Sequence, residues 1–270
     1  MPMDDISKRG LVLLGCGKMG SAMLMGWLER GLNPASVYII DPAPADVLAN
    51  RGVNVNAELP PDPAVILIAV KPQMMGDALP KIAPYGDGET LFVSVAAGTT
   101  LASFEEALGG GSPIVRAMPN TPAAIGRGIT AIIGNARVSA AQLDLAEELL
   151  SAVGQVVRLS EEAQMDAVTA VSGSGPAYVF HLIETLAEAG IAEGLSQDLA
   201  LQLARATVAG AGLLAEEAEE DAAQLRVNVT SPGGTTAAAL AVLMDEESGF
   251  PDLMRRAVAA AAARSRELGA

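Results

Sequence analysis

The chain of 270 residues has little cysteine, histidine, aromatic residue or positive charge. Its single cysteine, Cys16, excludes an intramolecular disulfide, which fits a protein of the reducing cytoplasm. Aromatic residues make up 3% of the chain, so alanine, leucine and valine must supply the core. Such small side chains favour closely packed helices. We expect no metal site.

Positive charge is scarce: 17 lysine and arginine residues stand against 32 acidic ones, a formal net charge of −15. This balance argues against nucleic-acid binding through a basic surface. The chain lacks an uncharged apolar run of about 20 residues, as a membrane span requires, and its first residues lack the core of a signal peptide. We therefore expect a cytoplasmic protein without nucleic-acid or membrane partners.

A glycine-rich stretch near the start organises the first half. The apolar run 11–14 leads into Gly15-x-Gly17-x-x-Gly20, and a segment with helical spacing follows up to residue 30. Strand, glycine turn and helix are the context of the dinucleotide-binding fingerprint. Free amides and the dipole at such a helix start favour a pyrophosphate. An ordinary glycine-rich turn is the alternative, and we prefer the fingerprint.

The first half alternates strands and helices. Apolar runs predict strands at residues 37–41, 53–57, 64–70, 91–97, 114–118, 128–133 and 155–159, and helices at residues 101–108 and 140–153. This alternation predicts an α/β fold with a Rossmann-type doubly wound sheet in residues 1–160. Ligands of such a sheet bind beyond the carboxyl ends of the strands, where Lys71 is the best-placed cation unless it is a solvated loop lysine.

Asp41 ends the second predicted strand. An acid at this place can accept both ribose hydroxyls of NAD and repel the 2′-phosphate of NADP. Because Pro42 and Pro44 follow, a turn or cap residue is equally compatible with the sequence. Arg51 is near enough in sequence to accept that phosphate instead.

From residue 161 onward the pattern is only helical, which predicts an all-α domain over residues 161–270. Breaks occur at Ser172-Gly-Ser-Gly-Pro176, at Ser196 and at Val229-Thr-Ser-Pro-Gly-Gly-Thr-Thr236. We expect Ser231 to cap the helix after the last break, with Pro232 at its first position. Its exposed amides predict an anion site, although a merely well-capped helix is the alternative. So much apolar helical surface also predicts contact between subunits.

The motifs resemble, in order, those of the pyrroline-5-carboxylate reductase family. Besides the glycine turn and the breaks that begin at Ser172 and at Val229, they are Ala69-Val-Lys-Pro72, Ala96-Ala-Gly98, Met118-Pro-Asn-Thr-Pro122 and Leu243-Met-Asp245. The stretch 229–236 resembles the family's specific signature, and the resemblance covers nearly the whole chain. It implies reduction of the C5=N imine of 1-pyrroline-5-carboxylate to L-proline by hydride from NADH or NADPH. It also implies an interleaved helical dimer, often assembled further into a decamer.

The resemblance, with the sites argued above, places the ligands on named residues. The cofactor-binding residues are expected to be Leu14, Gly15, Cys16, Gly17, Lys18, Met19, Asp41, Asn56, Ala69, Val70, Lys71, Pro72, Ala96, Ala97 and Gly98. The substrate-binding residues are expected to be Glu219, Ser231, Gly233, Gly234, Thr235 and Thr236. The hydroxyl of Thr236 is expected to act in catalysis by hydrogen-bonding the imine nitrogen, whereas His181 is expected to be structural.

The chain departs from the family pattern at a few positions. Asp41 stands where members often carry uncharged residues, which favours NADH over NADPH. Thr235 replaces a frequent alanine, and Asp221-Ala222 replaces a familiar His-Pro beside Glu219.

Two other functions remain open. One is a related β-hydroxyacid dehydrogenase or an imine reductase with a different substrate, and the other is a cofactor-binding regulator without turnover. Residues 161–270 contain no lysine, which argues against a lysine-dependent dehydrogenase. The complete stretch 231–236 argues against a regulator.

Overall fold

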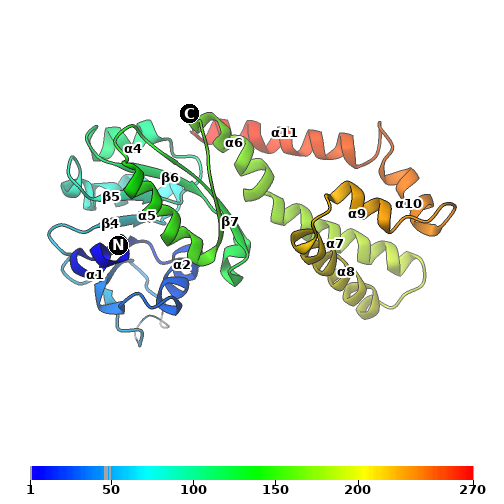
Figure 1. The fold of residues 1–270 in the computed structure, drawn as a ribbon, viewed down its shortest axis with the longest axis horizontal. Helices are drawn as coiled ribbons and strands as arrows, with labels where there is room; N and C mark the ends of the chain where they lie inside the picture. Colours follow the sequence, from blue (N-terminus) through cyan, green and yellow to red (C-terminus); the bar gives the residue numbers. More distant parts are fainter. Residues whose placement is uncertain (1, 46–47, 49, 270) are drawn as a thin grey trace. The chain divides into compact units, whose positions relative to one another are not determined.

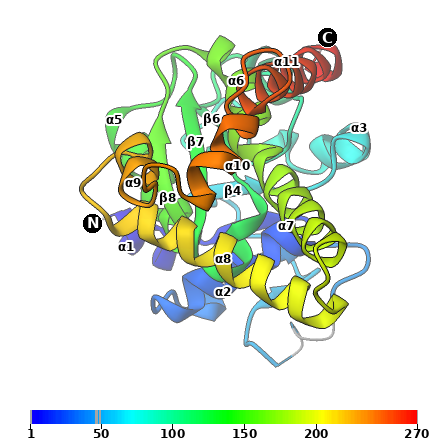
Figure 2. The same cartoon turned by 90° about the vertical axis from the view of Figure 1, so that its right-hand side faces the viewer.

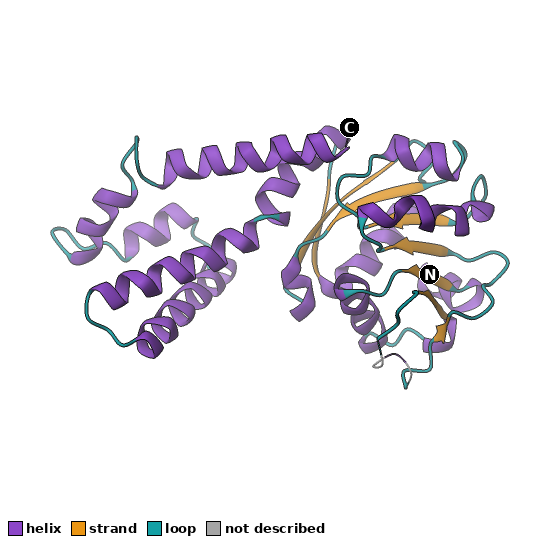
Figure 3. Cartoon of the chain, turned by 180° about the vertical axis from the view of Figure 1, so that it is seen from behind, coloured by secondary structure: helices purple, strands orange, loops and turns teal. Residues whose placement is uncertain are grey.

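The computed structural model describes residues 2–45, 48 and 50–269. Their contacts divide the chain into two compact units. Unit 1 extends to Gly173 and includes the chain again from Ala262, whereas unit 2 comprises Ser174–Ala261. Every strand among the described residues belongs to unit 1, and unit 2 is helical (Figures 1 and 3). The predicted boundary after residue 160 differs from this division, because Met165 and Ala170 beyond it are buried in unit 1.

The strands of unit 1 form one sheet. They are β1 (Leu11–Leu14), β2 (Val37–Ile40), β3 (Asn54–Val55), β4 (Val65–Ile68), β5 (Leu91–Ser94), β6 (Ile114–Met118), β7 (Gly128–Gly134) and β8 (Gly154–Arg158). The α-helices of unit 1 are α1 (Pro2–Arg9), α2 (Lys18–Glu29), α3 (Met75–Ala78), α4 (Leu101–Leu108), α5 (Ala140–Leu150) and α6 (Met165–Val168). Short 3₁₀ turns include η1 (Pro34–Ser36), η3 (Pro72–Met74), η4 (Leu79–Lys81), η5 (Ala83–Tyr85), η6 (Thr121–Ile125), η7 (Ser151–Val153) and η8 (Glu162–Gln164), and η9 (Thr169–Gly173) is a π-helical turn.

The strand order is β3-β2-β1-β4-β5-β6-β7-β8. Strands β1 to β6 pair in parallel, and Leu11 lies beside both Val37 and Val65. The order reverses between β1 and β4, which makes the carboxyl ends of these two strands the topological switch point. The predicted α/β class with a Rossmann-type doubly wound sheet is confirmed.

Strand β7 runs antiparallel to β6, with Arg116 opposite Ile133, a reversal that the sequence did not indicate. The connection, residues 119–127, contains only the short turn η6. A parallel pair needs a crossover of about a dozen residues or more, so this connection is too short for one. Strand β8 pairs with β7 in parallel, because α5 provides the crossover between them.

The sheet is covered on both faces, which explains its continuous apolar strands. Alternate residues of β1 point to opposite faces: Leu11 and Leu13 pack with α1, α2 and α5, whereas Val12 and Leu14 pack with α3 and α4. The buried indole of Trp27 donates a hydrogen bond to the carbonyl oxygen of Leu149 at 2.8 Å. This bond fixes α2 against α5.

Unit 2 begins with an antiparallel helix hairpin, α7 and α8 (Figures 1 and 2). Its helices are α7 (Gly175–Ala192), α8 (Gln197–Glu217), α9 (Ala222–Asn228), α10 (Thr235–Leu243) and the first part of α11 (Phe250–Gly269). The predicted cap of α8 is present, since the hydroxyl of Ser196 accepts from the amide of Leu199. The buried cluster is small: Ala187, Ala200 and Ala204, with Ile183 packed against them.

The start of α10 differs from the prediction. The helix begins at Thr235 instead of Pro232, and Gly234 is its N-cap. The preceding residues form a tight turn, in which the amide of Gly234 donates to the carbonyl of Ser231 at 3.0 Å. Gly233 has φ +69, a conformation that favours glycine, and a proline before such a glycine is typical of a type II turn.

Among the helices of the described residues, none combines the length and apolar character needed to span a membrane.

Candidate cofactor and substrate sites

Two glycines of the fingerprint are required by packing within unit 1. Gly15 has φ +89, and a Cβ built on it would lie 2.8 Å from Cγ1 of Val70. A Cβ on Gly20 would lie 2.5 Å from the carbonyl oxygen of Gly15. Any side chain at Gly20 would therefore push the first turn of α2 away from the end of β1.

Gly17 has a different role from its two neighbours. It is the N-cap of α2 with φ −69, a conformation open to any residue, and a Cβ on it would meet nothing within 4 Å. The amides of Lys18 and Met19 that follow have no acceptor within their helix, because they lie in its first turn. Open space, free amides and the positive end of the helix dipole fit a pyrophosphate.

Asp41 has the turn role that the sequence left open, and its carboxylate also contacts the glycine turn. One carboxylate oxygen accepts from the amide of Ala43 at 2.8 Å, as in a turn, and the other accepts from the amide of Cys16 at 2.7 Å. A carboxylate offers about four acceptor positions, so capacity for ribose hydroxyls remains. The side chain of Asn56 holds the backbone of Asp41 through two hydrogen bonds of 2.8 and 3.0 Å. Asn56 thereby positions Asp41.

Cys16 lies buried inside the glycine turn. Burial raises the pKa of its thiol and the charge of Asp41 raises it further, while a hydrogen bond with Ser21 lowers it. The hydroxyl of Ser21 also donates to the Cys16 carbonyl at 2.9 Å. The thiol is therefore protonated at neutral pH and serves as a small filler of the turn.

The carboxyl ends of β4 and β5 lead into the two other predicted cofactor segments. After β4, the amide of Ala69 donates to the carbonyl of Leu14 at 2.8 Å, and the exposed Lys71 precedes η3. After β5, the amide of Ala96 donates a hydrogen bond to the hydroxyl oxygen of Ser94 at 3.3 Å. Gly98 follows with φ +78. The structure thus brings Gly15–Gly20, 69–72 and 96–98 to the same edge of the sheet.

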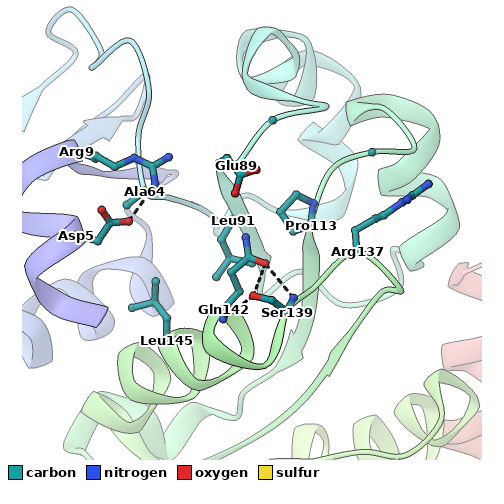
Figure 4. Close-up of a pocket in the computed structure, with 12 residues that line it drawn as sticks. Asp5, Arg9, Ala64, Glu89, Leu91, Pro113, Arg137, Ser139, Gln142 and Leu145 are labelled. Atoms are coloured by element: carbon teal, nitrogen blue, oxygen red, sulfur yellow. Dashed lines mark hydrogen bonds and ion pairs between the residues drawn. The ribbon is translucent and has the colours of Figure 1, made fainter. Parts of the chain in front are cut away.

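A cavity of about 390 Å³ lies at the opposite, amino-terminal edge of the sheet (Figure 4). The Arg9 guanidinium at this edge already pairs with Asp5 at 3.0 Å and with Asp62 at 2.9 Å. Ser139 and Gln142 satisfy each other in a capping box at the start of α5. These polar groups are therefore engaged with one another, and the carboxyl edge remains the candidate cofactor site.

The predicted substrate residues belong to unit 2. Thr235 and Thr236 occupy the first turn of α10, where their amides have no acceptor within the helix. The amide of Gly234, which the sequence assigned to an anion, is instead used by the carbonyl of Ser231. Glu219 is exposed in the connection between α8 and α9, and Asp221 beside it caps α9 by accepting from the amide of Gln224 at 2.8 Å.

A buried ion pair, which was not predicted from the sequence, lies close to the segment 96–98. Arg116 of β6 is 6% exposed and donates to Oε1 of Glu162 at 2.7 Å. The same oxygen accepts from the amide of Leu101, the first residue of α4, at 2.9 Å. An arginine inside the apolar strand 114–118 was the available signal, because a buried charge requires a partner.

Comparison with known proteins identifies the family. Residues 162–268 match the family model "Pyrroline-5-carboxylate reductase dimerisation", and residues 10–98 match "NADP oxidoreductase coenzyme F420-dependent". A pyrroline-5-carboxylate reductase of Pseudomonas aeruginosa is 42% identical over 264 residues, which cover 96% of each chain. This chain belongs to the pyrroline-5-carboxylate reductase family. The resemblance inferred from the motifs is confirmed.

Solved structures of the family have the same fold. A pyrroline-5-carboxylate reductase from Coxiella burnetii superposes with a TM-score of 0.90 at 35% identity and covers 97% of this chain and 99% of its own. The Plasmodium falciparum enzyme, solved with NADP bound, gives a TM-score of 0.82 at 30% identity and covers 98% of this chain and 99% of its own.

Replacing Gly17 should separate cofactor binding from folding. Gly17→Ala places a Cβ in space that is open within the protein, so thermal stability should stay unchanged. The same Cβ obstructs the pyrophosphate, so binding of NADH should weaken by about tenfold or more, roughly 1.4 kcal/mol. Fluorescence titration with NADH and a thermal melt measure the two effects.

Gly110→Ala is the matched control for Gly17→Ala, because a Cβ on Gly110 also meets nothing within 4 Å. It lies in the turn before β6, at the amino edge of the sheet, and should leave NADH binding unchanged. Undiminished NADH binding by Gly17→Ala would contradict the pyrophosphate assignment.

Proposed function

We propose that this chain reduces the C5=N imine of 1-pyrroline-5-carboxylate to L-proline, the last step of proline biosynthesis. Its full-length relation to pyrroline-5-carboxylate reductases carries this conclusion, because the match includes both glycine-rich helix starts. The bound nicotinamide cofactor supplies the hydride. The protein's residues bind and orient the two ligands.

The carboxyl edge of the sheet would hold the dinucleotide across the switch point. The first turn of α2 would receive the pyrophosphate at Gly17, Lys18 and Met19, and Asp41 would accept the hydroxyls of the adenosine ribose. The segments 69–72 and 96–98 lie on the other side of β1 in the strand order, so we assign the nicotinamide half to them. Lys71, which is exposed, would contribute a positive charge.

The start of α10 would hold the substrate. Its carboxylate matches the free amides of Thr235 and Thr236 at the positive end of the helix dipole. The Thr236 hydroxyl would hydrogen-bond the imine nitrogen and orient the ring, while Ser231, Gly233 and Gly234 shape the turn that presents these residues. The imine is protonated at neutral pH or takes its proton from solvent, so this mechanism requires no strong general acid. Glu219 stays a proposed contact on family resemblance.

Replacing Thr236 tests both the reaction and the role of its hydroxyl. The wild-type protein should oxidise NADH or NADPH only when 1-pyrroline-5-carboxylate is present. Thr236→Val keeps the shape of the side chain and should lower kcat/KM by about 100-fold, as loss of one aligned hydrogen bond at a reacting group does. Absorbance of the reduced cofactor measures the rate.

Thr207→Val is the control for this experiment, because it removes the same hydroxyl from the middle of α8, and it should retain activity. Undiminished turnover by Thr236→Val would remove the assigned role but not the reaction. Absence of imine-dependent oxidation by the wild type would overturn the reaction itself.

We further propose that the chain prefers NADH. The Asp41 carboxylate is fixed by the amides of Cys16 and Ala43 and by the clamp of Asn56 on its backbone. A phosphate on the ribose 2′-oxygen would approach this fixed negative charge, and like charges in close contact are unfavourable. Arg51, the cation that could accept this phosphate instead, is exposed, and no interaction of it with Asp41 is seen among the described residues.

Asp41→Ser should shift the preference toward NADPH. The change removes the repulsion and the ribose acceptor together, so the ratio of kcat/KM for NADPH to that for NADH should rise by about tenfold or more. Steady-state kinetics with both cofactors measure this ratio. Glu58→Gln, a charge removal at an exposed position two residues after Asn56, should leave it unchanged. A wild-type protein with the higher kcat/KM for NADPH would contradict the proposed preference.

Unit 2 buries only a small apolar cluster and leaves many large apolar side chains exposed. A groove of about 520 Å³ between α7 and α11 is lined by apolar residues that include Leu182, Phe250, Leu253 and Met254. Leu253 is 48% exposed and Phe250 is 43% exposed. Together with the dimerisation model matched by residues 162–268, this surface supports a homodimer through the helical domain. We include in this proposal the assembly of dimers into a decamer. We also propose a cytoplasmic location, with which the single cysteine is consistent.

A charge in this groove should weaken the dimer. Leu253→Glu would place an unpaired carboxylate in a buried interface, which is strongly unfavourable. Sedimentation velocity should show a dimer or larger assembly for the wild type and a shift toward monomer for the variant. Arg255→Ala, at a position exposed on the same helix, should sediment like the wild type. Unchanged assembly of Leu253→Glu would exclude the groove from the interface.

A further inference from the structure

The turn that carries Ala96, Ala97 and Gly98 lies against the end of the C-terminal helix. A Cβ on Gly98 would lie 3.3 Å from the carbonyl oxygen of Leu268, and a Cβ on Gly269 would lie 3.1 Å from the carbonyl oxygen of Gly98. Both segments belong to unit 1. The last turn of α11 therefore packs closely on the backbone of this turn, and a side chain at either glycine would make an unusually tight contact.

A buried hydrogen bond fixes that end of α11. Ser265 is 6% exposed, and it is the buried residue of α11. Its hydroxyl donates to Oδ1 of Asp166 in α6 at 2.6 Å, and Figure 1 draws the end of α11 beside α6. A short hydrogen bond to a carboxylate is stronger than one between neutral groups. Ser265 and Asp166 thus attach the helix end to the sheet unit.

The same stretch of chain also holds the other end of the turn. Glu162 lies four residues before Asp166, and its Oε1 accepts from the amide of Leu101 at 2.9 Å and from buried Arg116 at 2.7 Å. Leu101 opens α4, immediately after the turn. The stretch η8–α6 therefore holds the start of α4 through Glu162 and the end of α11 through Asp166, on either side of the turn.

We propose that Ser265 and Asp166 are positioning residues for the nicotinamide half of the dinucleotide. They act through the end of α11, which sets the backbone of Gly98. The proposal rests on the proposed function, because that assigns the turn to the nicotinamide half. The adenosine and pyrophosphate contacts, at Asp41 and the start of α2, involve neither residue. Loss of the hydrogen bond should therefore affect one half of the cofactor only.

Two ligands distinguish positioning from general stability. ADP carries the adenosine and pyrophosphate portions of NADH but lacks the nicotinamide. Ser265→Ala should raise the Kd of NADH by about tenfold and leave the Kd of ADP unchanged, as measured by calorimetric titration. The KM for NADH should rise correspondingly, whereas the KM for 1-pyrroline-5-carboxylate should not. Ser265→Thr retains the hydroxyl and should restore NADH binding.

Arg264→Ala is the control on the neighbouring residue, which is exposed and pairs with Glu267. It should change neither dissociation constant. Asp166→Ala, a second variant on the other partner of the hydrogen bond, should reproduce the selective loss if Ser265→Ala does not fold. Equal changes for NADH and ADP, or no change for either, would overturn the proposal. Because both titrations omit the imine, they are independent of whether the protein reduces it.

Discussion

The close approach of α2 to the end of β1 is the constraint on which the candidate cofactor site depends. A Cβ on Gly20 would lie 2.5 Å from the carbonyl oxygen of Gly15, so the helix can reach this position only without a side chain there. The approach brings the first-turn amides to the switch point of the sheet. At its other end α2 is fixed by the bond from Trp27 to Leu149. Both ends of the helix are thus set by the packing of the sheet unit, before any ligand binds.

Unit 2 differs from unit 1, because little apolar surface is buried within it. Three alanines form its buried cluster, and each buries far less apolar area than a leucine would. Large apolar side chains such as Leu203 and Leu214 are about half exposed, at 48% and 55%. The turn that presents Thr235 and Thr236 therefore belongs to a unit that gains its buried surface from association.

The apolar runs in the sequence predicted the strands of the sheet well, because parallel strands buried on both faces are continuous apolar runs. They carried no information on strand direction, so the reversal of β7 followed only from the length of its connection. The start of α10 was misplaced because Ser-Pro-Gly-Gly suits a cap and a tight turn equally. Asp41 was compatible with two roles because an acid at the end of a strand can bind a ribose, whereas an acid before Pro42 and Pro44 suits a turn. The bond between Ser265 and Asp166 joins residues 99 positions apart, and nothing local to either residue indicates it.

The helix α11 contributes to both units, since the chain passes from unit 2 to unit 1 at Ala262 within it. Leu253 lies in the groove that we assign to a partner subunit, and Ser265 lies at the end that supports Gly98. A partner that restricts the first part of this helix would restrict the second part as well, because the two are continuous. Coupling of this kind is reciprocal: if association favours the arrangement that binds NADH, then NADH must favour association by the same free energy. Under that condition, dimer stability and cofactor affinity vary together.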